Sequence, residues 1–182
     1  MIRALSALVL AGWLAGCAQL RPMPPGAPGA GEFELSGRVA VRYGKESATG
    51  RVQWRHSDAS DDLLITNPLG QGIARITRDA RQVELQTAEG RKESAPDAET
   101  LTERVLGWRL PLEGLPLWVR GLPRPDRPAE VSRDAEQRVR ELRQDDWRVE
   151  YEDYEGPRPS RLRLTRPDLE IRLIIESWQS SP

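Results

Sequence analysis

The sequence predicts a mainly β domain with a few helices, in which one antiparallel sheet forms an unclosed barrel under a helical lid. Apolar and charged residues alternate along most of the expected strands, which is typical of a sheet with one buried face. The gaps between these strands are short, as in meander connections. Helical spacing replaces the alternation only between residues 97 and 120, so this segment is the available cover for the apolar face.

The first expected strands lie between residues 33 and 87. Eleven alternating residues, 33–43, predict a half-buried strand, and Gly37 on its apolar side indicates a bend or bulge. The alternation continues through Val52 and Trp54 after a turn. Shorter strands are expected at 63–65, 73–77 and 83–87, and the order Asn67-Pro68-Leu69-Gly70 favours a type I turn.

A helical patch follows, and then strands return. Ala98, Leu101, Val105 and Trp108 share one helical face, with Asp97 as the expected cap and Gly107 near the end. A second short helix is expected over 112–119, followed by a proline-rich loop. Further strands are expected at 139–144, 147–151, 162–164 and 169–175, the last ending near Trp178.

The first sixteen residues have the form of an export signal. A basic start at Arg3 precedes the apolar run 4–14. A helix of that length spans about 16 Å, well short of the roughly 30 Å hydrocarbon core of a bilayer. We therefore expect a signal peptide over residues 1–16 and no transmembrane helix.

The one cysteine of the chain follows this leader. Leu14-Ala15-Gly16-Cys17 resembles the lipobox of bacterial lipoproteins, in which the cysteine thiol carries a diacylglyceryl group and the new amine is acylated. Cys17 is therefore the expected lipid attachment point, and Ala18 in place of Asp favours the outer membrane. Residues 17–32 are expected to be a lipidated Pro/Gly tether of about 45 Å at full extension, and residues 33–182 the folded domain.

Composition excludes several classes of function. The 27 basic and 28 acidic side chains leave a net charge of -1, which gives no indication of nucleic-acid binding. One cysteine and one histidine predict neither a disulfide nor a structural metal site, and no nucleotide-binding fingerprint is present. His56 is interpreted as an ordinary strand side chain. We expect no enzyme activity, no cofactor, no metal and a monomeric protein.

Two groups of residues, an acidic cluster and the tryptophans, each allow a functional and a structural interpretation. The acidic cluster Glu150, Glu152, Asp153 and Glu155 allows a hydrolase with paired carboxylates, although a solvated strand edge explains it as well. The tryptophans of the domain either fill the core or line a cavity for an apolar ligand; they are Trp54, Trp108, Trp118, Trp147 and Trp178.

The order of motifs resembles the LolB family of outer-membrane lipoprotein receptors, from about residue 33 to residue 178. The segments that carry the resemblance are Phe33-x-Leu35-x-Gly37-Arg38-Val39-Ala40, the Trp54 strand, Leu63-Leu64-Ile65-Thr66-Asn67-Pro68-Leu69-Gly70-Gln71, Leu106-Gly107-Trp108-x-Leu110-Pro111-Leu112, Leu115-x-x-Trp118-x-x-Gly121-Leu122-Pro123, Gln144-x-x-Trp147-x-Val149-x-Tyr151 and the isoleucine-rich strand to Trp178. Two segments depart from the pattern: Asp146 replaces an expected glycine, and the charged stretch 124–136 matches nothing.

The resemblance implies a LolA/LolB-like half-barrel whose apolar cavity accepts the acyl chains of other lipoproteins from LolA, a periplasmic carrier of similar fold. The protein would then insert these lipoproteins into the outer membrane from its periplasmic face. The candidate cavity residues are Trp54, Leu64, Trp108, Trp118 and Trp147, with Leu173 left unassigned.

The resemblance also assigns the turn Pro68-Leu69-Gly70 to membrane insertion. From the sequence alone, Leu69 either points into solvent or folds back onto its own hairpin. Insertion of one leucine into a bilayer gains roughly 1.5–3 kcal/mol, enough to orient the loop. Two alternative functions remain, which are a carrier of another lipid and a structural or assembly lipoprotein.

Overall fold

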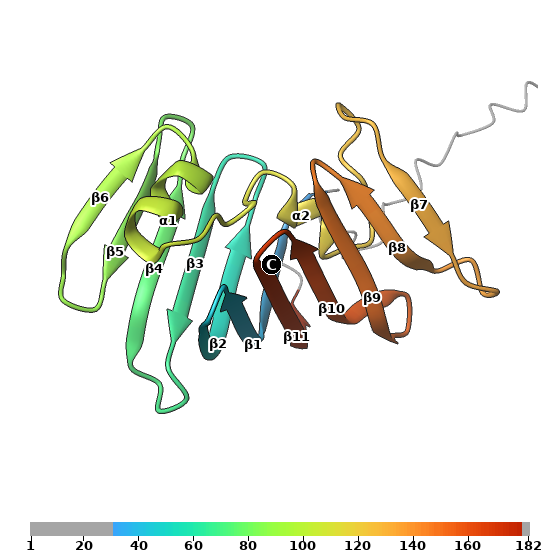
Figure 1. The fold of residues 1–182 in the computed structure, drawn as a ribbon, viewed down its shortest axis with the longest axis horizontal. Helices are drawn as coiled ribbons and strands as arrows, with labels where there is room; N and C mark the ends of the chain where they lie inside the picture. Colours follow the sequence, from blue (N-terminus) through green and yellow to red (C-terminus); the bar gives the residue numbers. More distant parts are fainter. Residues whose placement is uncertain (1–30, 180–182) are drawn as a thin grey trace, which may run out of the picture.

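The computed structural model describes residues 31–179, and within them eleven strands form one antiparallel sheet (Figure 1). The strands are β1 (Phe33–Tyr43), β2 (Glu46–His56), β3 (Asp61–Thr66), β4 (Gly72–Arg78), β5 (Val83–Thr87), β6 (Lys92–Ala95), β7 (Glu130–Arg133), β8 (Val139–Gln144), β9 (Trp147–Glu155), β10 (Arg158–Arg166) and β11 (Leu169–Gln179). The sheet order is β6-β5-β4-β3-β2-β1-β11-β10-β9-β8-β7, so the first and last strands pair at its centre.

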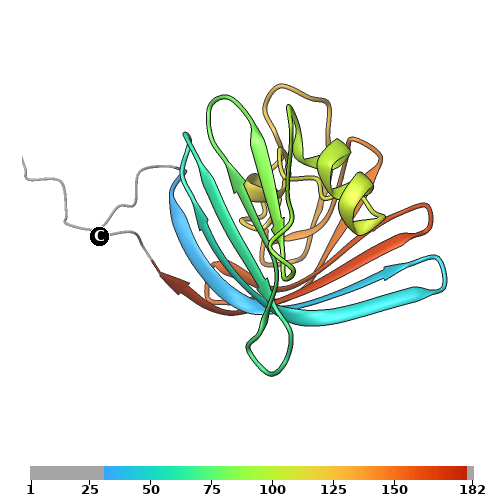
Figure 2. The same ribbon diagram turned by 90° about the vertical axis from the view of Figure 1, so that its left-hand side faces the viewer.

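The sheet curves into an open cup, and two short helices lie in its concave side (Figure 2). They are α1 (Ala98–Leu106) and α2 (Leu115–Trp118). This arrangement confirms the expected half-barrel under a helical lid. None of the helices within residues 31–179 has the length and apolar character needed to cross a bilayer.

The long strand β1 has the alternation and the bulge that the sequence predicts. Its register against β11 shifts between Ser36 and Gly37. A Cβ at position 37 would lie 2.1 Å from the carbonyl oxygen of Ile174, much closer than van der Waals contact. Glycine is therefore required where the two central strands approach each other.

The helices differ in part from the sequence prediction. Asp97 caps α1 as expected, and its carboxylate accepts a hydrogen bond from the backbone N–H of Thr100 at 2.8 Å. Gly107 ends α1 with a φ of 81°, so Trp108 lies beyond the helix and not on its face. The second helix is shorter than the predicted 112–119, because residues 112–114 form a turn that precedes it and Val119 is its C-cap.

Two strands were not predicted. β6 and β7 have four residues each and lie at the two edges of the sheet. Every residue of β7 is exposed, so this strand has no apolar face to create an alternating pattern. It falls within the charged stretch that matched nothing in the family.

Asp146 takes the place of the glycine expected before Trp147, and the turn there has a strained backbone conformation. Asp145 and Asp146 connect β8 to β9 and have φ values of 51° and 62°. Both residues are in the left-handed region that two-residue hairpin turns require and that Asp accepts better than most residues. The departure from the family pattern therefore leaves the hairpin intact.

Candidate functional site

An apolar cavity of about 230 Å³ lies between the concave face of the sheet and the lid. Its walls come from β1 to β4, β10 and β11, together with the end of α1 and the segment that leads to α2. The lining residues are Leu35, Val39, Val41, Ala48, Thr49, Gly50, Val52, Trp54, Leu63, Ile65, Ile73, Ala74, Leu106, Trp108, Leu110, Leu115, Leu164, Ile171 and Leu173. With this lining, the cavity suits a hydrocarbon and offers almost nothing to a polar ligand.

Trp54 and Trp108 line this cavity, as does Leu173. The structure corrects the position of Leu64, which lies opposite Gln53 and Arg75 on the other face of the sheet. Because side chains alternate along a strand, its neighbours Leu63 and Ile65 form the wall instead. All three residues of Leu63-Leu64-Ile65 are apolar, so the sequence did not indicate which of them face the core.

Trp118 and Trp147 lie under the other half of the sheet, and neither lines the cavity. Their ring centroids are 6.2 Å apart, and both side chains are buried. The Trp118 indole N–H donates to Oε1 of Gln144 at 3.0 Å, and the Tyr151 hydroxyl donates to the carbonyl of Trp118 at 2.8 Å. These contacts place the two tryptophans in a packed core.

A buried carboxylate supports the cavity wall behind Trp54. Asp61 is 2% exposed, and its Oδ1 accepts hydrogen bonds from Nε1 of Trp54 at 2.8 Å and from Nδ1 of His56 at 2.7 Å. Nε of Arg78 donates to Oδ2 at 2.5 Å. Burial raises the pKa of Asp61, but the hydrogen bonds from His56, Arg78 and Trp54 outweigh it, so this pKa lies below its usual value.

The sequence reasoning missed this cluster. Asp61 precedes an apolar strand and carries no motif, and only its pairing opposite His56 in the β2–β3 hairpin could have indicated the contact. His56 belongs to this cluster through its hydrogen bond with Asp61.

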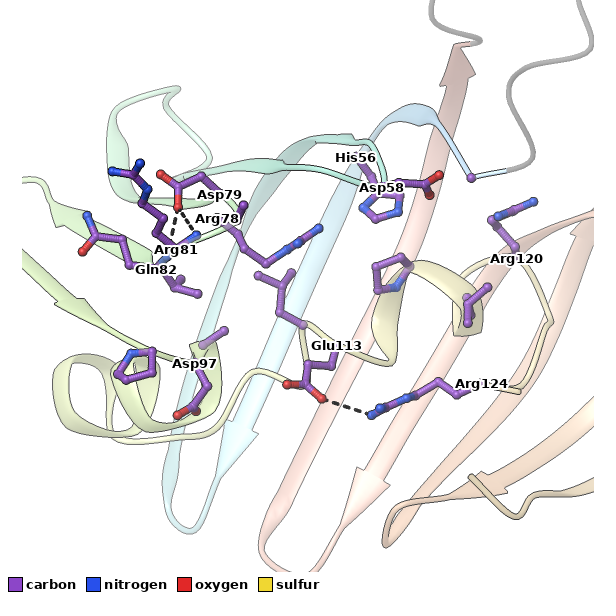
Figure 3. A pocket seen from close by; sticks show the side chains of 18 residues that line it. His56, Asp58, Arg78, Asp79, Arg81, Gln82, Asp97, Glu113, Arg120 and Arg124 are labelled. Carbon is purple, nitrogen blue, oxygen red and sulfur yellow. Dashed lines mark hydrogen bonds and ion pairs between the residues drawn. The ribbon is translucent and has the colours of Figure 1, made fainter. Parts of the chain in front are cut away.

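A larger hollow of about 700 Å³, with polar and apolar residues in its lining, lies beside His56 (Figure 3). Its arginines and carboxylates are mixed, and several are already engaged. Asp79 accepts hydrogen bonds from the backbone N–H groups of Arg81 and Gln82, and Glu113 pairs with Arg124 at 3.3 Å. Asp79 therefore stabilises a turn and Glu113 joins two loops, and the hollow has a mixed lining without a concentrated charge.

The acidic cluster has a structural explanation too. Glu150 pairs with Arg163 at 3.7 Å, and Glu152 makes a short ion pair with the same guanidinium. None of the four carboxylates lines either hollow. Among residues 31–179, no group of three or more His, Cys, Asp or Glu side chains is placed to hold a metal.

The β3–β4 loop presents Leu69 to solvent. Oδ1 of Asn67 accepts hydrogen bonds from the backbone N–H of Leu69 at 2.9 Å and of Gln71 at 3.0 Å. The N–H of Gly70 donates to the Asn67 carbonyl at 2.9 Å, which closes the expected turn. Leu69 is 87% exposed. Of the two sequence alternatives, the side chain therefore takes the outward one.

Cys17, the expected leader of residues 1–16 and the part of the expected tether before residue 31 lie outside the described residues.

The fold has a counterpart among solved structures. A LolA superfamily protein from Nitrosomonas europaea superposes with a TM-score of 0.52 at 10% identity, over 83% of this chain and 86% of that one. Identity this low shows the fold alone. The half-barrel with its lidded apolar cavity thus defines a protein of the LolA/LolB-like fold class.

Sequence similarity gives the family. The family described as "Outer membrane lipoprotein LolB" matches residues 31–178. A relative from Thiobacillus denitrificans, named outer-membrane lipoprotein LolB, is 39% identical over the full length of both chains. One of the same name from Nitrosomonas europaea is 42% identical over 81% of this chain and 72% of its own.

The chain belongs to the LolB family. Members of this family are outer-membrane lipoprotein receptors that act in lipoprotein localisation. The family is not known as an enzyme family.

Proposed function

We propose that the protein, anchored by acyl chains on Cys17 at the periplasmic face of the outer membrane, accepts lipoproteins from a LolA-like carrier. It binds their acyl chains in the apolar cavity and releases them into the outer membrane. The observation that carries the proposal is the cavity itself, whose walls are apolar on the sheet and on the lid. No covalent step and no cofactor are needed, because each methylene is worth about 0.8 kcal/mol in either of two apolar cavities.

The lid must move for an acyl chain to enter. The cavity of about 230 Å³ is smaller than the roughly 300–1,000 Å³ of typical ligand pockets. α1 packs mainly against β5 and β6 at one edge of the sheet, and Gly107 follows it in the left-handed conformation. Displacement of the segment around Trp108 would therefore enlarge the cavity while α1 stays attached.

Receipt and release use different parts of the molecule in this proposal. The cavity receives the acyl chains, and the β3–β4 loop meets the bilayer. Leu69 adds roughly 1.5–3 kcal/mol when it inserts, which orients the loop but does not anchor the protein. The anchor is the lipid on Cys17, since two or more acyl chains hold a protein firmly.

The test is transfer of a labelled, triacylated lipoprotein from a LolA-like carrier to the mature chain without its lipid anchor. We expect stable uptake, and then delivery to liposomes. Leu69→Glu should keep uptake and lose most delivery. Leu122→Glu is the matched control, because Leu122 is also exposed, at 43%, but lies outside the loop, and it should behave as wild type.

Two outcomes would change the assignment. If Leu69→Glu delivered cargo as well as wild type, the loop would have no role in release. If a folded protein took up no lipoprotein, the structural or assembly function would replace the receptor function. Binding of free phospholipid without any exchange with the carrier would instead favour a carrier of another lipid.

A further inference from the structure

The outer face of the sheet carries a groove beside the β3–β4 loop. Its volume is about 380 Å³, and Arg38, Arg51 and Arg172 line it together with Pro68. These arginines belong to three adjacent strands, β1, β2 and β11, at the centre of the sheet. Their side chains are 61%, 58% and 55% exposed.

The charges around this groove are unbalanced. Arg38 lies directly opposite Arg51 in the β1–β2 pairing, an arrangement of like charges that is unfavourable by itself. One carboxylate, Glu176, bridges both, at 2.8 Å from Arg38 and 2.9 Å from Arg51. Arg172 and Arg42 likewise share Glu170, at 2.8 Å and 3.3 Å. Two carboxylates thus serve four guanidinium groups.

The surplus donors fit a phosphate. Each guanidinium carries five N–H donors in a planar fork that matches phosphate oxygens, and the two shared carboxylates engage only part of them. The floor of the groove contains Ala40 and Ile174, which offer no competing acceptor from their side chains. Most of the groove surface is apolar, so an anionic group that approaches from solvent would be held by the guanidinium groups of the three arginines.

The position of the groove indicates where that group comes from. Pro68 lines the groove, and the next residue, Leu69, is the exposed tip of the loop. Figure 2 shows this loop extending from the sheet on the side away from the helices. When Leu69 enters a bilayer, Arg51 and its neighbours come near the level of the lipid headgroups.

We propose that the groove lined by Arg38, Arg51 and Arg172 binds the phosphate of anionic phospholipid headgroups when the β3–β4 loop meets a bilayer. The inference rests on the proposed function, since it assumes that Leu69 inserts. It adds a lipid preference to delivery: an anionic bilayer surface orients the receptor, and a zwitterionic surface does so less well.

The test uses the full lipidated chain in vesicles, with a fluorophore attached through Gln53→Cys. Gln53 is exposed on β2, two residues from Arg51. Vesicles of phosphatidylcholine contain a nitroxide-headgroup lipid as quencher, and phosphatidylglycerol is added stepwise. We expect quenching to rise with phosphatidylglycerol, and to fall again in high salt because exposed charges are screened.

Three variants test whether the arginines of the groove cause this response to phosphatidylglycerol. Arg51→Gln should weaken association with the anionic surface about fivefold, the usual effect of one arginine, and so raise the phosphatidylglycerol fraction at half-maximal quenching. Glu176→Gln should lower it, because it frees Arg38 and Arg51 from their shared carboxylate. Arg140→Gln, at an exposed position of β8 in the other half of the sheet, is the matched control and should change nothing.

Three results would overturn the proposal: no effect of Arg51→Gln, an equal effect of Arg140→Gln, or a change in the same direction for Glu176→Gln and Arg51→Gln. The opposite signs expected for Arg51→Gln and Glu176→Gln separate headgroup binding from loss of folding. Uptake of lipoprotein from the carrier in solution is measured in parallel. Failure of uptake with quenching intact would count against the receptor function and not against the groove.

Discussion

The two halves of the sheet are built from similar residues but packed differently. Under β1 to β4, Trp54 and Trp108 surround a cavity. Under β8 to β10, Trp118 and Trp147 fill the space, and Gln144 fixes them. The amide of Gln144 also accepts from the backbone N–H of Arg124 and donates to its carbonyl. Buried hydrogen bonds of this kind favour a single arrangement.

This difference assigns separate tasks to the halves. A core tied by a side-chain amide has few alternative packings, so the half with Gln144 is suited to be a fixed scaffold. The half with the cavity has incomplete packing between sheet and lid, and can therefore admit a ligand. Each of the following predictions tests this division, from the largest effect on stability to the smallest.

The wall of the hollow half depends on Asp61. Asp61→Ala leaves the guanidinium of Arg78 and the indole N–H of Trp54 without their buried acceptor. We expect a loss of about 3–5 kcal/mol in the free energy of unfolding, as for other broken buried pairs. Urea denaturation measures it. Glu113→Ala, in an exposed pair with Arg124, should be nearly neutral; a loss for Asp61→Ala as small as that of this control would contradict the prediction.

Acid should weaken the same cluster. The pKa of Asp61 is lower in the folded than in the unfolded protein, where it is about 3.9. Its contribution to stability is therefore present above about pH 4 and is lost as the pH falls further through the folded pKa. Thermal unfolding between pH 6 and pH 2 should show a steeper acid decline for wild type than for Asp61→Asn, and parallel curves would refute this assignment.

Enlarging a small side chain should distinguish the halves directly. Ala74→Leu adds three carbons in the cavity wall, and we expect little loss of stability because the space exists. Val149→Leu adds one methylene at a position that is 0% exposed in the filled half, and should cost about 1–3 kcal/mol by overpacking. Lipoprotein uptake should fall for Ala74→Leu and persist for Val149→Leu. A larger loss of stability for Ala74→Leu than for Val149→Leu, or a larger loss of uptake for Val149→Leu, would contradict the proposed difference between the halves.

The ion pair between Glu99 and Arg166, which links the two halves, should contribute least to the free energy of unfolding. Glu99 on α1 lies 4.0 Å from Arg166, whose guanidinium stacks over Trp147. Burial raises the pKa of Glu99, although Arg166 and Arg109 oppose it. The stability from a raised pKa is present in acid and lost as the pH rises through it. Glu99→Gln should therefore change the free energy of unfolding at pH 7 by about 0.5 kcal/mol or less, and a larger loss in urea denaturation would show that the link holds the lid.

The sequence was most informative where one strand face is buried. β1 and β5 have the predicted bounds because their apolar residues alternate with polar ones. Edge strand β7 could not be predicted, since its residues have no buried side. Leu64 was misplaced because three consecutive apolar residues leave the register open.

The residues that line the cavity could not be predicted from the sequence for a different reason. Trp54, Trp108, Trp118 and Trp147 have the same chemistry, and only the tertiary packing decides which of them border a hollow. The exposure of Leu69 depends on a local cause, the hydrogen bonds of Asn67, but the sequence allowed either direction. Asp61 shows no motif and gains its role only from strand pairing.

The pairing of the first strand with the last has a consequence for how the protein folds. Ser36 and Ser177 share a hydrogen bond of 2.8 Å although they are 141 positions apart. Each half of the sheet is a meander of local contacts, whereas the seam between the halves closes only after the final strand has been synthesised. Because non-local pairing slows folding, the seam should form late, after the meander of each half.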